Sequence, residues 1–254
     1  MDNWLNVGID GQGCWPREES TIKFGGYELL LKPATRKTEQ SVHINLVKEK
    51  ISSEDAMTLI NRLLSVLSWC DGGSKGMDII DGLGWSGNPI PVEIPIRNRM
   101  IGSSIAFSFY KEMDKNPKTR LALALYREGL VSDSVPVSFL SFFKIINIFY
   151  NDKTIRIKKQ KPYNQLVEGL RSLIPHAKCD LAKQRLQELS KVVNDIPKYL
   201  YKRRCAIAHS FTDPAIDPDN VMESRDLSKD LWIVSSIADY LIENKLGVSR
   251  SILG

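Results

Sequence analysis

The hydrophobic pattern of this 254-residue chain changes once along its length, and that change limits the folds open to it. In residues 21–31 and 41–47 apolar side chains alternate with polar ones, as they do in strands. From Pro117 onward the apolar side chains recur every three or four positions, as in helices that bury one stripe. The sequence therefore predicts an α+β protein with a small sheet-containing domain over residues 1–116 and an all-helical bundle over residues 117–254.

Gly, Pro and capping residues interrupt each pattern and mark where the expected helices and strands begin and end. A helix is expected to begin at Ser52 and to end at the Gly-rich residues 71–73. Residues 77–96 hold too many Gly and Pro for a helix, which leaves short strands or an ordered loop, and the Gly-rich residues 8–13 are interpreted as a turn. In the second domain helices are expected over residues 119–129, 136–150, 163–174, 182–211 and 228–244, with Pro197 kinking or restarting the fourth.

Composition excludes several classes of protein. With 43% hydrophobic and 26% charged residues, the chain has the composition of a soluble globular protein and not of a disordered or collagen-like one. Its most apolar stretch, residues 135–150, contains Lys144 and is shorter than the roughly 20 residues of a membrane span. No signal peptide is visible, and the four Cys are widely spaced. We expect a cytoplasmic protein with reduced thiols, no membrane contact, and neither metal nor cofactor.

Positive charge is concentrated in one segment. Residues 151–204 hold 14 Lys and Arg against 5 acidic residues, a net charge of +9, so the rest of the chain carries −4 of the total of +5. Such an excess can attract a phosphate backbone, but it is also typical of a solvated helix surface. Charge alone leaves both interpretations open.

The sequence contains three His, and one of them lies in a helical context. Four residues separate Arg204 from His209, and five separate Arg203 from His209. The other two His also follow an Arg at a similar spacing, with four residues between Arg171 and His176 and six between Arg36 and His43. Spacing is therefore not diagnostic by itself, and the expected helix around residues 203–209 singles out His209.

Helical geometry suggests how this segment would work. At 100° per residue, Lys202 and Cys205 share a face with His209, whereas Arg204 points about 140° away from it. Two such helices packed about a two-fold axis would bring both Arg and both His to one cleft. There His209 would transfer a proton and Arg would stabilise a charged phosphate. In the alternative interpretation, His209 packs near a helix end and the two Arg belong to a basic surface.

Residues 119–240 resemble the HEPN superfamily of helical domains. Within them, LALALYREGLVSDSVPVSFLSFFKIINIFY (121–150) and RRCAIAHSFTDP (203–214) are similar to the proteins called methylamine utilisation protein MauJ. The HEPN resemblance implies a homodimer that cleaves RNA without a metal ion. It also implies a role in toxin or antiphage defence systems, in which a partner protein or antitoxin can inhibit the nuclease. The MauJ name implies an accessory role in amine metabolism, for which no residue gives support.

The HEPN motif is an Arg followed, after four to six intervening residues, by a His. Carried over to this sequence, it implies catalytic residues Arg204 and His209, with Arg203 as the alternative Arg. Their neighbours Lys198, Lys202 and Cys205 are the expected RNA contacts. The position after the motif Arg is usually Asn, Asp or His in active nucleases, and here it is Cys205, or Arg204 if Arg203 is the motif Arg. A thiol is a weak hydrogen-bonding group. A HEPN-type module that binds RNA or a nucleotide, or serves in assembly, without cleavage is therefore the alternative function.

Overall fold

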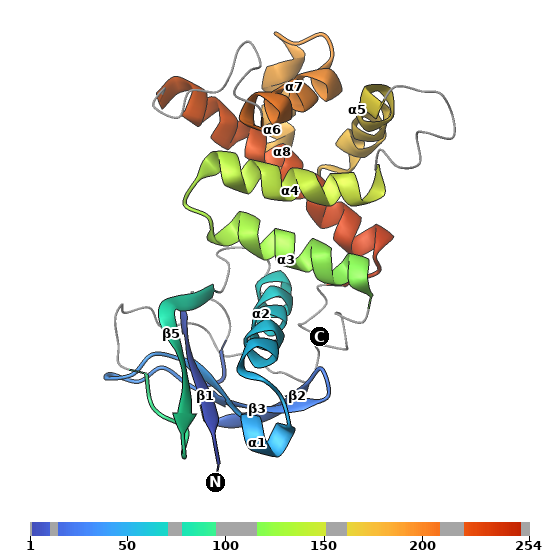
Figure 1. Ribbon diagram of the computed structural model, residues 1–254. Coiled ribbons are helices and arrows are strands. Elements are labelled where there is room, and N and C mark those ends of the chain that lie inside the picture. Colours follow the sequence, from blue (N-terminus) through green and yellow to red (C-terminus); the bar gives the residue numbers. More distant parts are fainter. Residues whose placement is uncertain are drawn as a thin grey trace. The chain divides into compact units, whose positions relative to one another are not determined.

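The computed structural model describes residues 2–10, 15–70, 78–94, 116–150, 162–208 and 221–249, and it confirms the α+β class (Figure 1). Two compact units divide the chain, residues 1–131 and 132–249. This division lies beyond the expected boundary at residue 116 because α3 (Pro117–Val131) packs against α2 (Ser53–Cys70). Arg127 Nη1 donates to Asn61 Oδ1 at 2.8 Å, and the rings of Trp69 and Tyr126 meet edge to face with centroids 5.1 Å apart.

The N-terminal unit is built on an antiparallel sheet of five strands in the order β2-β3-β4-β1-β5. The strands are β1 (Trp4–Asp10), β2 (Ser20–Phe24), β3 (Tyr27–Lys32), β4 (Ser41–Asn45) and β5 (Asp78–Asn88). A short helix, α1 (Leu46–Glu49), follows β4 directly, with Asn45 as its N-cap. The turn expected over residues 8–13 is wrong for residues 8–10, which belong to β1; residues 11–14 lie outside the described part.

A two-residue turn corrects the single strand expected over residues 21–31. The structure forms a hairpin in which Phe24 pairs with Tyr27 and the chain reverses at Gly25 and Gly26. Their φ angles are 58° and 91°, in the region that favours glycine and that two-residue hairpin turns require. A Cβ at Gly25 would also lie 2.6 Å from Leu59 Cδ1, so this position has no room for a side chain.

Alternation along the strands gives the sheet two different faces. One face carries the apolar residues of the core, which are almost completely buried: Leu5, Val7, Ile9, Leu29, Leu31, Val42 and Ile44. The other face carries Asn6, Ser41 and His43, with exposed fractions of 0%, 1% and 0%. A polar sheet face is normally solvated. Here the segment after β5 contacts it, since the Val92 amide donates to Asn6 Oδ1 at 2.9 Å.

The helical unit contains α4 (Val135–Phe149), α5 (Pro162–Leu173), the 3-10 turn η3 (Ile174–His176), α6 (Asp180–Ser190), α7 (Ile196–Ala208) and α8 (Val221–Lys245). The helices α4 and α8 pack together (Figure 1). Both carry completely buried apolar side chains, among them Phe139, Phe143, Val234 and Ile237. In the described part of the chain, no helix combines the length and the apolar character needed to cross a membrane.

Pro197 restarts a helix, as the sequence predicts. The helix α6 ends at Ser190, and α7 begins at Ile196 with Pro197 in its first turn, where a missing amide hydrogen costs nothing. Asp195 caps the new helix, because its Oδ1 accepts the Lys198 amide at 3.2 Å. The helix expected to reach residue 211 is described as far as Ala208.

Burial of His43 makes the stability of the N-terminal unit depend on pH. Burial lowers the pKa of His43 from 6.5 to about 4, and the positive charge of Lys32 acts in the same direction. Between these two pH values the His43 imidazole is protonated in the unfolded chain but not in the folded one. The free energy of unfolding is therefore highest above pH 6.5 and decreases as the pH falls toward 4. We expect a loss of about 2–3 kcal/mol by pH ~4.5, from ~1.4 kcal/mol per pKa unit.

Urea unfolding of the native protein and of His43→Gln, at neutral pH and at pH ~4.5, measures this contribution. The variant should be less stable at neutral pH yet lose less stability on acidification. An equal loss in both proteins would show that His43 does not carry the effect.

Candidate nucleic-acid interface in the helical unit

The helix α7 carries five of the six residues expected to act on RNA, and its sides differ in exposure. Lys198 and Lys202 are exposed and lie 40° apart around the helix axis. Arg203 and Arg204 are half-buried, and Leu200 is completely buried against the rest of the unit. The sequence therefore directs two Lys to the solvent and turns Arg203 toward the interior.

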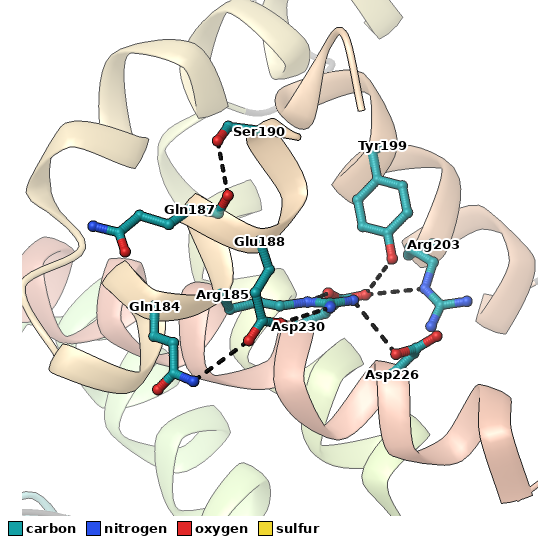
Figure 2. Close-up of polar contacts among 9 residues, drawn as sticks. All are labelled: Gln184, Arg185, Gln187, Glu188, Ser190, Tyr199, Arg203, Asp226 and Asp230. Atoms are coloured by element: carbon teal, nitrogen blue, oxygen red, sulfur yellow. Dashed lines mark hydrogen bonds and ion pairs between the residues drawn. The ribbon is translucent and has the colours of Figure 1, made fainter. Parts of the chain in front are cut away.

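A buried carboxylate receives Arg203. Asp230 of α8 has no exposed surface, and its two oxygens accept three hydrogen bonds from neighbouring helices (Figure 2). Arg185 Nε of α6 donates to Oδ1 at 2.8 Å. Tyr199 Oη and Arg203 Nε of α7 donate to Oδ2 at 2.7 and 3.2 Å. Asp230 thus joins α6, α7 and α8 at one point.

Further contacts hold the two Arg side chains in place. Arg185 also pairs with Glu188 at 3.2 Å and with Asp226 at 3.8 Å. Arg203 Nη2 donates to the Glu223 carbonyl at 3.5 Å, and its guanidinium lies 5.8 Å from the centre of the Tyr199 ring. Figure 2 shows these side chains converging on Asp230 from both sides. We call Arg185, Tyr199, Arg203 and Asp230 the Asp230 cluster.

Electrostatics of the cluster fix its protonation. Burial raises the pKa of Tyr199 to about 12, and the negative charge of Asp230 adds to the increase, so the phenol remains a donor at neutral pH. Burial opposes the charge of Arg185, but its hydrogen bonds to Asp230 and Glu188, together with the negative charge of Asp230, outweigh this effect and raise the pKa of the guanidinium. Two guanidinium groups and a neutral phenol therefore face one carboxylate.

The other expected site residues have weaker contacts. Arg204 Nη1 lies 3.9 Å from Cys205 Sγ, a weak interaction at most. Within the described residues no acidic side chain pairs with Lys198, Lys202 or Arg204. His209 follows α7 directly and lies outside the described part of the chain. The structure thus separates Arg203 from the remaining cations of α7.

Asp230 is the residue of this region that sequence reasoning missed. Hydrophobic periodicity predicts the helix that holds Asp230, but not a charge on its buried stripe. That stripe runs Leu227, Asp230, Val234 and Ile237, with Asp230 at an apolar position. A lone carboxylate at such a position was a visible signal, since buried acids are nearly always paired. Its partners were not visible, because Arg185 and Arg203 lie 45 and 27 residues before it.

Residues 122–243 match the family model of methylamine utilization protein MauJ. The match begins within α3, ends within α8 and includes the whole Asp230 cluster. It confirms, for this region, the similarity to MauJ proteins that the sequence suggests. No curated protein matches the chain, and no solved structure does.

Replacing Asp230 by Asn should destabilise the helical unit by about 3 kcal/mol, because Arg185 and Arg203 would be left largely buried without a carboxylate. The matched control is Asp226→Asn, which removes the 3.8 Å contact of a half-exposed acid with the same Arg185 and should cost less than about 1 kcal/mol. Urea unfolding followed by circular dichroism at 222 nm compares the two. Equal losses would mean that burial of Asp230 does not govern its contribution.

Proposed function

We propose that the helical unit is a HEPN-type domain that binds RNA through the solvent side of α7. We call Lys198 and Lys202, which are exposed and lie on one side of the helix, the basic side of α7. The observation that carries the proposal is the division of α7: Arg203 is held by Asp230, whereas no acidic group of the described residues pairs with the basic side. Unpaired cations in a row attract phosphates, which neutralise them and release counterions.

Ion pairs within the unit reduce the number of cations that are available to bind RNA. Several cations of residues 151–204 are already neutralised, in the pairs Arg171–Glu168, Arg171–Asp195, Lys183–Asp180, Arg185–Asp230 and Arg203–Asp230. The positive potential of the +9 segment therefore rests on fewer side chains than its sequence contains. Lys198 and Lys202 are exposed members of that remainder, and they lie on the same side of one helix.

Metal-independent cleavage of RNA is the second candidate function. With Arg203 bound by Asp230, Arg204 is the Arg left to pair with His209 at the HEPN spacing. In a homodimer, His209 would move a proton to or from a ribose hydroxyl and Arg204 would stabilise the charged phosphate. This reaction suits a cytoplasmic toxin or antiphage defence protein held silent by a partner. Cys205, beside Arg204, favours the alternative of binding without cleavage.

If the basic side of α7 contacts RNA, neutralising it should weaken binding. We expect Lys198→Gln with Lys202→Gln to lower affinity for a single-stranded RNA and to reduce the slope of log affinity against log salt by about 1–2, one phosphate contact for each Lys. Fluorescence anisotropy at several salt concentrations measures both quantities. Lys245→Gln, an exposed Lys at the other end of the unit, removes the same kind of charge and should leave affinity and slope unchanged.

Binding that is absent from the native protein, or unaffected in the double variant, would contradict the proposed interface. Failure of the native protein to bind RNA would favour the role in amine metabolism that the MauJ name implies.

Cleavage is tested by incubating RNA with the native protein in excess chelator. We expect His209→Ala and Arg204→Ala to slow cleavage by about 100-fold or more, the typical contribution of a general acid–base or a positioned charge, while Lys245→Gln cleaves normally. A native protein that binds RNA but leaves it intact would establish the non-catalytic alternative. Cleavage by the His209 variant at the native rate would exclude His209 as the catalytic group.

A further inference from the structure

A second set of polar residues lies in the N-terminal unit, on the buried polar face of the sheet. Strand pairing places Asn6 of β1 opposite His43 of β4, and Lys32 of β3 opposite Ser41 of β4. Ser41 and His43 are two residues apart on one strand and share a face. Topology therefore brings together a hydroxyl, an imidazole and a carboxamide that are all essentially inaccessible to bulk solvent.

These three side chains form a continuous hydrogen-bonded chain. Ser41 Oγ lies 2.8 Å from His43 Nε2, and His43 Nδ1 lies 2.8 Å from Asn6 Oδ1. Asn6 Oδ1 also accepts the Val92 amide, while Asn6 Nδ2 donates to the Trp4 carbonyl at 3.3 Å. Because Asn6 presents an acceptor, Nδ1 of neutral His43 must carry the hydrogen, and Nε2 is left to accept the Ser41 hydroxyl.

This arrangement has the order of groups found in nucleophilic catalysis. A nucleophile is activated by Nε2 of a His whose Nδ1 hydrogen is held by a third residue. His43 must be neutral to accept a proton, and burial, aided by Lys32, holds its pKa near 4. The imidazole is therefore a free base at neutral pH.

A small cavity borders this hydrogen-bonded chain at Ser41. Its volume is about 190 Å³, and Ser41 is one of its lining residues, together with Lys32, Glu19, Glu39 and Glu93. The volume is enough for a group the size of benzene, and therefore for the acyl part of a small ester. With three carboxylates against one ammonium group, the lining favours cationic or neutral ligands over anionic ones.

We propose that Ser41, His43 and Asn6 form a Ser–His–Asn site that is acylated by small carboxylic esters, an activity separate from RNA binding. Ser41 Oγ attacks the ester carbonyl carbon while its proton moves to His43 Nε2. The bond between the acyl carbon and the alkoxy oxygen then breaks, and the leaving alcohol takes that proton. A water molecule, deprotonated by His43, attacks the acyl carbon, and Ser41 recovers its proton as the carboxylic acid leaves.

Two neighbours define the remaining roles. Lys32 lies opposite Ser41 in the strand pairing and lines the same cavity, so its positive charge is close to where an oxyanion would form at Ser41. Its Nζ also pairs with Glu19 at 3.6 Å. Asn6 is a positioning residue, because it holds the ring and the tautomer of His43 without lining the cavity.

A small alkyl fluorophosphonate tests the nucleophile, because it phosphonylates an activated serine and expels fluoride. Incubation with the full chain at neutral pH, followed by peptide mapping in a mass spectrometer, should find the adduct on Ser41. Ser41→Ala should remove the adduct and the release of p-nitrophenol from p-nitrophenyl acetate. Ser65→Ala changes another buried serine, in α2, and should retain both. No adduct on native Ser41 would overturn the proposal, and this result does not depend on the folding of any variant.

The pH profile distinguishes a catalytic relay from a merely structural one. Lys32 is the charged group that acts on His43 among the described residues, and the neutral side chains of Ser41 and Asn6 are its hydrogen-bonding partners. The labelling rate should therefore rise through pH ~4 and stay level to neutral pH. Asn6→Asp keeps the acceptor but adds a negative charge, which should move the rise toward higher pH. A rise near pH 6.5 in the native protein, or one that Asn6→Asp leaves in place, would contradict the assigned roles.

Discussion

The helical unit depends on one buried negative charge. Asp230 has no access to solvent, and a carboxylate in that position is tolerated only if its oxygens are fully hydrogen-bonded and its charge is balanced. Arg185, Tyr199 and Arg203 satisfy both conditions from two other helices. The same requirement sets the rotation of α7 about its axis, since Arg203 must face α8. It therefore leaves Lys198 and Lys202 facing the solvent.

In the N-terminal unit, buried polar side chains are stabilised without ion pairs. Asn6, Ser41 and His43 are neutral groups that satisfy one another in a chain and need no counter-charge. Their hydrogen bonds define one tautomer of His43 and one orientation of the Asn6 amide. Such fixed orientation is what a nucleophilic site requires, and it follows from strand pairing. The two units thus hold polar clusters of different chemistry, one charged and one neutral.

Much of the secondary structure could be predicted from the sequence, because periodicity and capping are local. The start of α7 at Ile196, with Asp195 as its cap and Pro197 in its first turn, is an example, since both effects act within a few residues. The hairpin at Gly25 and Gly26 was missed although its signal is local, since Gly-Gly between two alternating runs is typical of a two-residue hairpin turn. The boundary at residue 116 differed from the structure because the contacts of α3 with α2 join residues far apart in the chain.

The sequence by itself determined the α+β class, the similarity to MauJ proteins, and the concentration of cations and of a candidate Arg–His pair near residues 198–209. Only the tertiary structure decided which cations remain available, because neutralisation depends on partners from other helices. It also decided that His43, which the sequence places only in a strand, is hydrogen-bonded to both Ser41 and Asn6. The physical reason is the same in both units: the environment of a polar side chain is set by residues that meet only when distant segments pack.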